Sequence, residues 1–359
     1  MSSDTGPTTL EFRQTARNGE FVGTSIIIWL LNIVTLTLYR FWARTTVRKM
    51  IWSRTLLNDE PFEYTGKGSE LFKGFLIALA VITIPYLLVV FLAQLLPPLI
   101  AAPLVLVLVL AAYWAIGAAI WLSFRYLASR TTWRGIRFTL DGKPTEFSTF
   151  YFMQLILTAV TFGWWTPRMD INVPEYLWGH LRYGDIAITY DKTEAALESR
   201  YGPFAIGWIF TFFGYFGLVG LLTGSMLASG LDPQNPETMI GFMAVLYAGV
   251  FVFLLLAVVI WAPYQAAALR AVVRGLKVGN ATFRLNITWT TMAWLTFSNL
   301  LLMVFTLGIA TPVVQARTAR YLISRLESEG TVDLSRAEQA VRGPGQAEGL
   351  SDALEIGFV

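Results

Sequence analysis

The chain has 359 residues, of which 55% are hydrophobic and 14% charged, with a net charge of +3 and a mean hydropathy of +0.55. Soluble globular domains carry roughly a quarter charged residues, so this composition excludes that class and indicates an integral membrane protein. Because the chain has no cysteine, disulfides, thiolate metal ligands and cysteine nucleophiles are also excluded.

Residues 1–20 are polar and precede the first hydrophobic segment, Phe21 to Tyr39. They lack the apolar core of a signal peptide, and no small-residue cleavage site follows Tyr39. We therefore expect residues 1–20 to form a polar N-terminal segment and the first hydrophobic segment to be retained.

Further hydrophobic segments follow in windows that contain no Asp, Glu, Lys or Arg. About 20 apolar residues suffice to cross a bilayer, and the first window is long enough for two passes, which the prolines of "LLPPLIAAP" separate. The sequence thus predicts an all-α polytopic membrane protein with about seven hydrophobic segments, two long hairpins and three shorter segments. The windows are Gly74 to Phe124, Phe147 to Pro167, Pro203 to Leu231, Met239 to Leu269 and Thr288 to Ala316.

An internal repeat organises the chain, since three stretches beginning at Asn32, Thr158 and Met303 share one pattern. Each has an apolar run, a Thr-Leu or Thr-Phe step, a break, an amphipathic stretch with arginine and a short alternating segment. We expect a first unit at 21–147, a second at 148–288 and a partial third at 289–334. The polar stretch 335–359, with scattered Gly and Pro, predicts a disordered tail.

The break in each copy predicts a bend between two helices. Gly163 and Gly308 let the chain turn, and Pro167 and Pro312 suit the first turn of a new helix. The helix after each break, here called an arm, need not continue along the membrane axis.

The arms carry basic residues at helical spacing, with aromatic and aliphatic residues on the other face. This pattern predicts helices that lie along the lipid headgroups and bind anionic lipid or a cytoplasmic protein partner. Ordinary cytoplasmic flanks that follow the positive-inside rule are the alternative. The candidate binding residues are Arg44, Arg48, Lys49, Arg317, Arg320 and Arg325.

Short segments with period-two alternation predict β-strands beside the arms. Since isolated strands are unstable, we expect them to pair into a small sheet on the cytoplasmic face; irregular loops are the alternative. The segments are "LEFRQT", "PFEYTG", "GIRFTLDG", "DIAITYD" and "ATFRLNIT".

Two topologies fit the hydrophobic segments. If all seven cross the bilayer, the second unit is an inverted copy of the first, as in many transporters, but many basic residues then face outward, against the positive-inside rule. If the three short segments enter and return on one side, only the hairpins span, and all 27 Lys and Arg lie on the cytoplasmic face. We favour the one-sided topology, and both place the C-terminus inside.

Residues for catalysis or metal binding are nearly absent from the sequence. The single histidine, His180, has no second His or Cys for a metal site, and no nucleophile motif or paired membrane carboxylate is present. We expect no catalytic residues, no metal and no cofactor. Three polar residues of the short segments, Asn32, Gln154 and Asn299, predict hydrogen bonds between helices, with a polar path for a substrate as the alternative.

The residues resemble the YjgN-like inner-membrane proteins of bacteria, a family of unknown function. "TLGIATPVVQARTARYLISRL" is similar to the family's Thr-Leu-Gly-Ile-x-x-Pro motif and Arg-Tyr helix, and "FRQTARNGEFVGTSIIIWLLNIVTLTLYRFWARTTVRK" resembles its opening. The resemblance covers most of Leu10 to Leu334. Thr37 replaces the motif's glycine, and the middle arm keeps few basic residues. The resemblance implies a fold and an inner-membrane location, without a known reaction.

We therefore expect a non-enzymatic platform anchored in the bacterial inner membrane, multi-pass, that binds anionic lipids and no nucleic acid. A transporter or channel for a neutral or lipid-like substrate is the first alternative. A membrane enzyme that acts on lipid phosphates is the second, although no general base is evident. The sequence does not predict an oligomeric state.

Overall fold

A computed structural model describes residues 9–228 and 236–334 of the chain. Residues 1–8 of the polar N-terminal segment and the predicted disordered tail, 335–359, lie outside the described residues. So do residues 229–235, near the middle of the second predicted hairpin.

The described chain is mostly helical. The helices are α1 (Asn18–Val34), α2 (Arg40–Trp52), α3 (Gly68–Ala78), the π-helix η1 (Leu79–Thr83), α4 (Ile84–Ala93), α5 (Pro98–Ser129), α6 (Pro144–Val160), α7 (Thr166–Gly179), α8 (Lys192–Ala196), α9 (Tyr201–Ala228), α10 (Pro236–Gly275), α11 (Trp289–Phe305) and α12 (Thr311–Ile323).

As the sequence predicts, short strands accompany the helices, and in the described residues they pair into an antiparallel strand layer that is larger than the small sheet expected. It consists of a three-stranded sheet in the order β1-β2-β3 and an eight-stranded sheet in the order β11 to β4. The strands are β1 (Phe12–Gln14), β2 (Thr55–Leu57), β3 (Glu60–Pro61), β4 (Glu63–Tyr64), β5 (Thr131–Trp133), β6 (Ile136–Leu140), β7 (Leu181–Tyr183), β8 (Ile186–Tyr190), β9 (Leu276–Val278), β10 (Ala281–Leu285) and β11 (Leu326–Glu329).

The strand layer curls so that its first and last strands approach each other. The hydroxyl of Ser328 on β11 donates to the carbonyl oxygen of Leu10 at 2.5 Å, and the rings of Phe12 and Phe283 lie 6.1 Å apart. An apolar core fills the layer and includes Trp133, which is only 1% exposed. Opposite ends of the chain are therefore joined in one core.

The same succession of strand, short helix, bend, arm helix and strand is found at three places. The short helices are α1, α6 and α11, and the arms are α2, α7 and α12. In each case the strand before the short helix pairs with the strand after the arm: β1 with β2, β6 with β7, and β10 with β11. Each short helix therefore leaves the strand layer, and its arm returns to the same layer.

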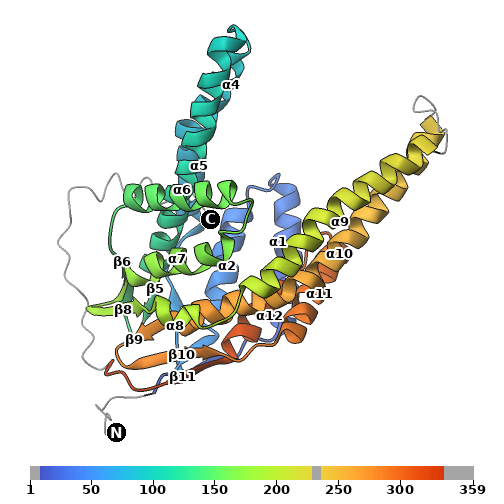
Figure 1. The fold of residues 1–359 in the computed structure, drawn as a ribbon. Coiled ribbons are helices and arrows are strands. Elements are labelled where there is room, and N and C mark those ends of the chain that lie inside the picture. The colour runs from blue at the N-terminus through green and yellow to red at the C-terminus, as the bar shows by residue number, and fades with distance from the viewer. Residues whose placement is uncertain (1–8, 229–235, 335–359) are drawn as a thin grey trace.

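Two long helix pairs rise from this layer, and both begin and end at paired strands. The rod α3-η1-α4 and its partner α5 lie between β4 and β5, and α9 and α10 lie between β8 and β9. Both pairs extend away from the strands on the same side of the molecule and diverge (Figure 1).

Fewer helices are long enough to cross a membrane than the seven segments that the sequence predicts. Three described helices have the length and apolar composition to cross: Pro98–Ser129, Tyr201–Leu227 and Met239–Gly275. The rod that pairs with α5 is interrupted by the π-helix, and the short helices α1, α6 and α11 have 17 residues each.

Two consecutive residues with positive φ form the bend between each short helix and its arm, as the glycines predict. In the third bend they are Leu307 and Gly308, at φ of 49° and 83°. The N–H of Gly308 donates to the carbonyl of Met303 at 2.8 Å, and Thr306 accepts the N–H of Ala310 on its side-chain oxygen at 3.1 Å. The predicted prolines, Pro167 and Pro312, lie in the first turns of α7 and α12.

The tips of these bends are apolar and exposed. Leu36 is 84% exposed, Phe162 79% and Leu307 90%. All three bends thus expose an apolar side chain at the corresponding position. Exposed apolar surface that recurs in this way indicates contact with an apolar phase.

Candidate functional site

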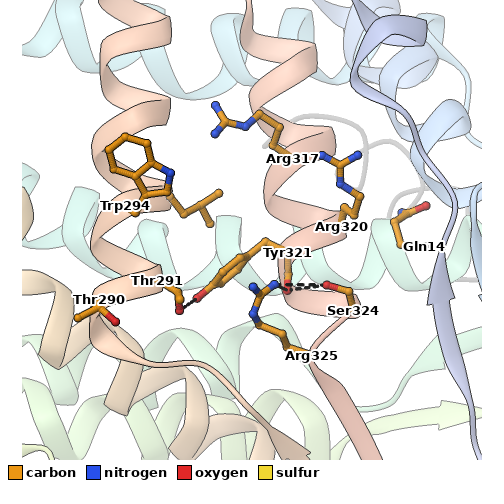
Figure 2. Close-up of a pocket in the computed structure, with 10 residues that line it drawn as sticks. Gln14, Thr290, Thr291, Trp294, Arg317, Arg320, Tyr321, Ser324 and Arg325 are labelled. Carbon is orange, nitrogen blue, oxygen red and sulfur yellow. Dashed lines mark hydrogen bonds between the residues drawn. The ribbon is translucent and has the colours of Figure 1, made fainter.

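A basic pocket of about 660 Å³ lies beside the third arm (Figure 2). Two helices and the first strand, from opposite ends of the chain, supply its walls. The lining residues are Gln14 from β1, Thr290, Thr291, Trp294 and Leu295 from α11, Arg317, Arg320 and Tyr321 from α12, and Ser324 and Arg325 after α12.

Each of the three predicted arginines is held by neutral groups. Arg317 donates to the hydroxyl of Ser298 at 2.9 Å and points between α12 and α11, towards the side that bears Trp294 (Figure 2). The guanidinium of Arg325 lies 4.1 Å from the ring centroid of Tyr321.

Arg320 connects the third arm to the N-terminal part of the chain. Its guanidinium donates to the carbonyl oxygen of Ala16 at 3.3 Å and to the side-chain oxygen of Asn18 at 3.1 Å. The first and last units are thus bonded directly at this pocket.

The pocket has an uncompensated positive charge. Within residues 9–228 and 236–334, Arg317, Arg320 and Arg325 form no ion pair with a carboxylate. Several arginines elsewhere form such a pair, as Arg130 does with Glu70 at 3.1 Å. Guanidinium groups bind carboxylate and phosphate with paired hydrogen bonds, so the pocket is suited to an anionic oxygen ligand.

An apolar and a polar wall flank this charge. The side chain of Trp294 is 68% exposed at the edge of the pocket, and tryptophan is enriched where a membrane meets water. The hydroxyls of Tyr321 and Thr291 lie 2.7 Å apart and are joined by a hydrogen bond (Figure 2).

The predicted residues of the first arm lie apart from this pocket. Arg44 and Arg40 line a second pocket, of about 340 Å³, between α1, α2 and the third bend. Arg48 donates to the hydroxyl of Tyr64 at 3.3 Å, and Lys49 is exposed. The structure therefore brings the three predicted residues of the third arm together in one pocket, but not those of the first arm.

The three predicted polar residues differ in their surroundings. Gln154 accepts from the indole of Trp165 at 2.7 Å and from Asn172 at 3.1 Å, and Asn299 donates to Thr318 at 3.2 Å. The bonds to Asn172 and Thr318 join a short helix to its arm, as expected for contacts between helices. Asn32 lines the second pocket instead. Its side-chain oxygen, like that of Asn299, has no partner among the described residues.

The middle arm has a different polar cluster, which the sequence does not predict. Tyr264 donates a short hydrogen bond to Asp170, and burial raises the pKa of Asp170, opposed by this bond and by the charge of Arg200. Arg200 is 5% exposed. The middle arm is thus held to the second helix pair by buried polar contacts.

Seven pocket residues beyond the predicted arginines are missed by sequence reasoning: Gln14, Thr290, Thr291, Trp294, Leu295, Tyr321 and Ser324. The helical spacing of Thr290 and Trp294 is the one local signal. Gln14 gives none, because only the curling of the strand layer brings β1 to α12. In the described part of the chain, no group of three or more His, Asp or Glu is arranged to hold a metal ion.

Comparison with known proteins identifies the family of this chain. No match is found among curated proteins or among solved structures. The model of a family described as a bacterial protein of unknown function, DUF898, matches residues 9–353. The narrower resemblance to YjgN-like proteins stays a prediction. Because the match spans nearly the whole sequence, the chain belongs to the DUF898 family.

Proposed function

We propose that the protein is a non-enzymatic platform in the bacterial inner membrane and that its basic pocket holds the headgroup of an anionic lipid. The observation that carries this proposal is the set of three half-buried arginines, Arg317, Arg320 and Arg325, without a carboxylate partner in the described chain. The phosphate of a lipid supplies the missing anion, and Trp294 lies where the pocket meets the acyl region.

In this proposal the two helix pairs cross the bilayer, and the three short helices enter it and return. The exposed apolar tips at Leu36, Phe162 and Leu307 support the entry of the short helices. A bend within a bilayer needs partners for its backbone groups. In the third bend, every N–H from Thr306 to Thr311 donates to a carbonyl or to the hydroxyl of Thr306, which removes the main physical objection.

The strand layer supports a one-sided arrangement. Strands from all three units pair in succession in the eight-stranded sheet, and the strand after the first arm lies in the three-stranded sheet, so every arm returns to the strand layer. We place this layer and the C-terminus in the cytoplasm, because the arms then follow the positive-inside rule. A transporter built from inverted repeats remains the alternative function, and an acidic cytoplasmic protein is the alternative ligand of the arms.

Lipid binding by two pocket variants tests the proposal. The purified protein is reconstituted with phosphatidylglycerol or phosphatidylcholine, and bound lipids are counted by native mass spectrometry. Each basic contact contributes about 1 kcal/mol, so we expect the double variant Arg317→Gln, Arg325→Gln to bind phosphatidylglycerol roughly 30-fold less tightly. The difference should decrease at high salt, because ions screen the charges.

The matched control is the double variant Arg13→Gln, Arg284→Gln. These arginines are 62% and 63% exposed and pair with Asp59 and Glu329, so the control removes the same charge away from the pocket. We expect its lipid binding to match that of the original protein. Equal binding by both double variants, at low salt, would overturn the headgroup role.

A further inference from the structure

A third pocket, here called the apolar pocket, has a volume of about 410 Å³ and lies between the strand layer and the arms. All three arms or their ends contribute to its wall, with Trp52 from α2, Trp178 from α7 and Ile323 from α12. The strands supply further apolar side chains, among them Phe12 and Phe138. The pocket is therefore at the junction of the three units.

The wall of this pocket offers almost no free hydrogen-bonding group. Its two threonines are both already bonded. Thr131 accepts the indole N–H of Trp52 at 3.0 Å and donates to the carbonyl of Leu127. Thr55 accepts from Gln14 at 2.8 Å and donates to the carbonyl of Ile51. No charged side chain lines the wall, so an occupant gains nothing from polar groups here.

The pocket is much larger than the voids that ordinary packing leaves. Native interiors are densely packed and contain few voids larger than a water molecule. An apolar cavity of about 150 Å³ already stays dry and holds a benzene ring. A wall of aromatic and aliphatic side chains around a much larger space is the usual composition of a site for an apolar ligand.

We propose that this pocket holds a long unbranched hydrocarbon chain. Phe124 and Leu127 of the wall belong to the last two turns of α5, which has the length and composition to cross a membrane, so the pocket lies where α5 joins the strand layer. Arm α12 separates it from the basic pocket, with Ala319 and Ile323 facing the apolar pocket and Arg317 and Arg320 facing the basic one. This hydrocarbon chain belongs to a membrane phospholipid or to a free fatty acid.

Photo-cross-linking tests the proposal on the full-length protein in detergent micelles. Two probes are compared. One is palmitate with a diazirine in its hydrocarbon chain, and the other is phosphatidylglycerol with the same group in an acyl chain. Cross-linked peptides are identified by mass spectrometry. We expect saturable labelling of the peptides that contain Phe124 to Ala128 and Ala319 to Leu326, displaced by an excess of unlabelled probe. The probe that labels these peptides identifies the source of the hydrocarbon chain.

The variant Ala319→Phe fills the pocket from the third arm. Labelling of these peptides should fall by about tenfold. The phenyl ring takes space that methylene groups of the probe would occupy, so the probe buries less apolar surface and binds less tightly. The matched control is Ala111→Phe, on the exposed surface of α5, and its labelling should be unchanged. If Ala319→Phe does not fold, Ala128→Leu fills the pocket with a smaller group. Labelling confined to the outer surfaces of the helix pairs, or equal in both variants, would overturn the proposal.

Discussion

Thr37 and Gly308 occupy the same step of two corresponding bends, with φ of 70° and 83°. In both, the backbone N–H donates to a carbonyl oxygen five residues earlier, at 2.6 Å in Thr37 and 2.8 Å in Gly308. The first bend thus keeps the backbone of the others without their glycine. A side chain with a branched Cβ is strained in this conformation.

The variant Thr37→Gly should therefore stabilise the protein. Glycine relieves the strain of the left-handed backbone, but it loses more conformational entropy on folding. The balance predicts a rise in the free energy of unfolding of about 0.5–1 kcal/mol. The thermal midpoint in detergent, followed by intrinsic fluorescence, measures the change. The reverse change, Gly308→Thr, should lower the midpoint, and a rise in that variant would contradict the explanation.

The hydroxyl of Thr306 should be essential to the third bend. The change Thr306→Val keeps the shape but leaves the N–H of Ala310 without its acceptor, which should reduce the free energy of unfolding by about 1–3 kcal/mol. Thr223→Val is the control, since Thr223 is exposed and donates to carbonyls of its own helix. A similar loss of stability in both variants, measured by chemical unfolding, argues against the role of Thr306.

Arg320 should stabilise the junction between the two ends of the chain. Its bonds to Ala16 and Asn18 involve a charged donor, so Arg320→Gln should reduce the free energy of unfolding by about 1.5–3 kcal/mol. A double-mutant cycle with Asn18→Ala measures the coupling between the two side chains. The exposed Arg13→Gln serves as the reference. A coupling free energy near zero would mean that the bond to Asn18 contributes nothing.

Tyr183 should make stability depend on pH in the alkaline range. It is 5% exposed, and its hydroxyl donates to the carbonyl of Trp133 at 3.0 Å. Burial raises the pKa of Tyr183 to about 12, above its value of about 10 in an unfolded chain. The protonated phenol thus stabilises the fold fully below pH 10, and this contribution is lost as the pH rises towards 12.

The variant Tyr183→Phe should accordingly be less stable by about 1–2 kcal/mol at neutral pH, where the carbonyl of Trp133 loses its donor. The difference from the original protein should shrink above pH 10. Thermal midpoints across the pH range measure both effects, with the exposed Tyr201→Phe as control. A difference that stays constant up to pH 12 contradicts the assigned pKa.

Cysteine labelling distinguishes the two topologies, since the chain has no cysteine of its own. Single cysteines are introduced at Asp59, Ala187 and Leu99, and intact cells are treated with a membrane-impermeant thiol reagent. Asp59 lies in the turn between β2 and β3 of the first unit, and Ala187 in β8 of the second unit, so we expect both to be shielded. Leu99, 88% exposed at the far end of the first helix pair, should react. Reaction of Ala187 from outside would favour seven crossings and the transporter.

The local patterns of the sequence predicted the elements with regular periodicity. All five alternating segments contain paired strands, and both glycine bends are where the sequence placed them. The remaining strands, such as β3 and β9, have only two to four residues. Period-two alternation is not detectable over such lengths, so the sequence predicts fewer strands than the structure contains.

The sequence predicts one binding role for the basic residues of the first and third arms, whereas the structure places these residues in different surroundings. Arg44 and Arg317 line different pockets, because the neighbours of each arm come from distant parts of the chain. Gln154 and Asn299 stand at the same distance from their bends, and both bond to the following arm. Asn32 stands closer to its bend and faces a pocket instead.

By itself, the sequence determined the membrane class, the hydrophobic segments, the bends and the spacing of the basic residues. Each of these depends on composition or on contacts within a few residues. The tertiary structure alone decided the pairing of the strands, the contact of Leu10 with Ser328 and the assembly of Gln14 with Arg320 in one pocket. These contacts join residues about 300 positions apart, and they form only because the strand layer must cover its apolar core on all sides.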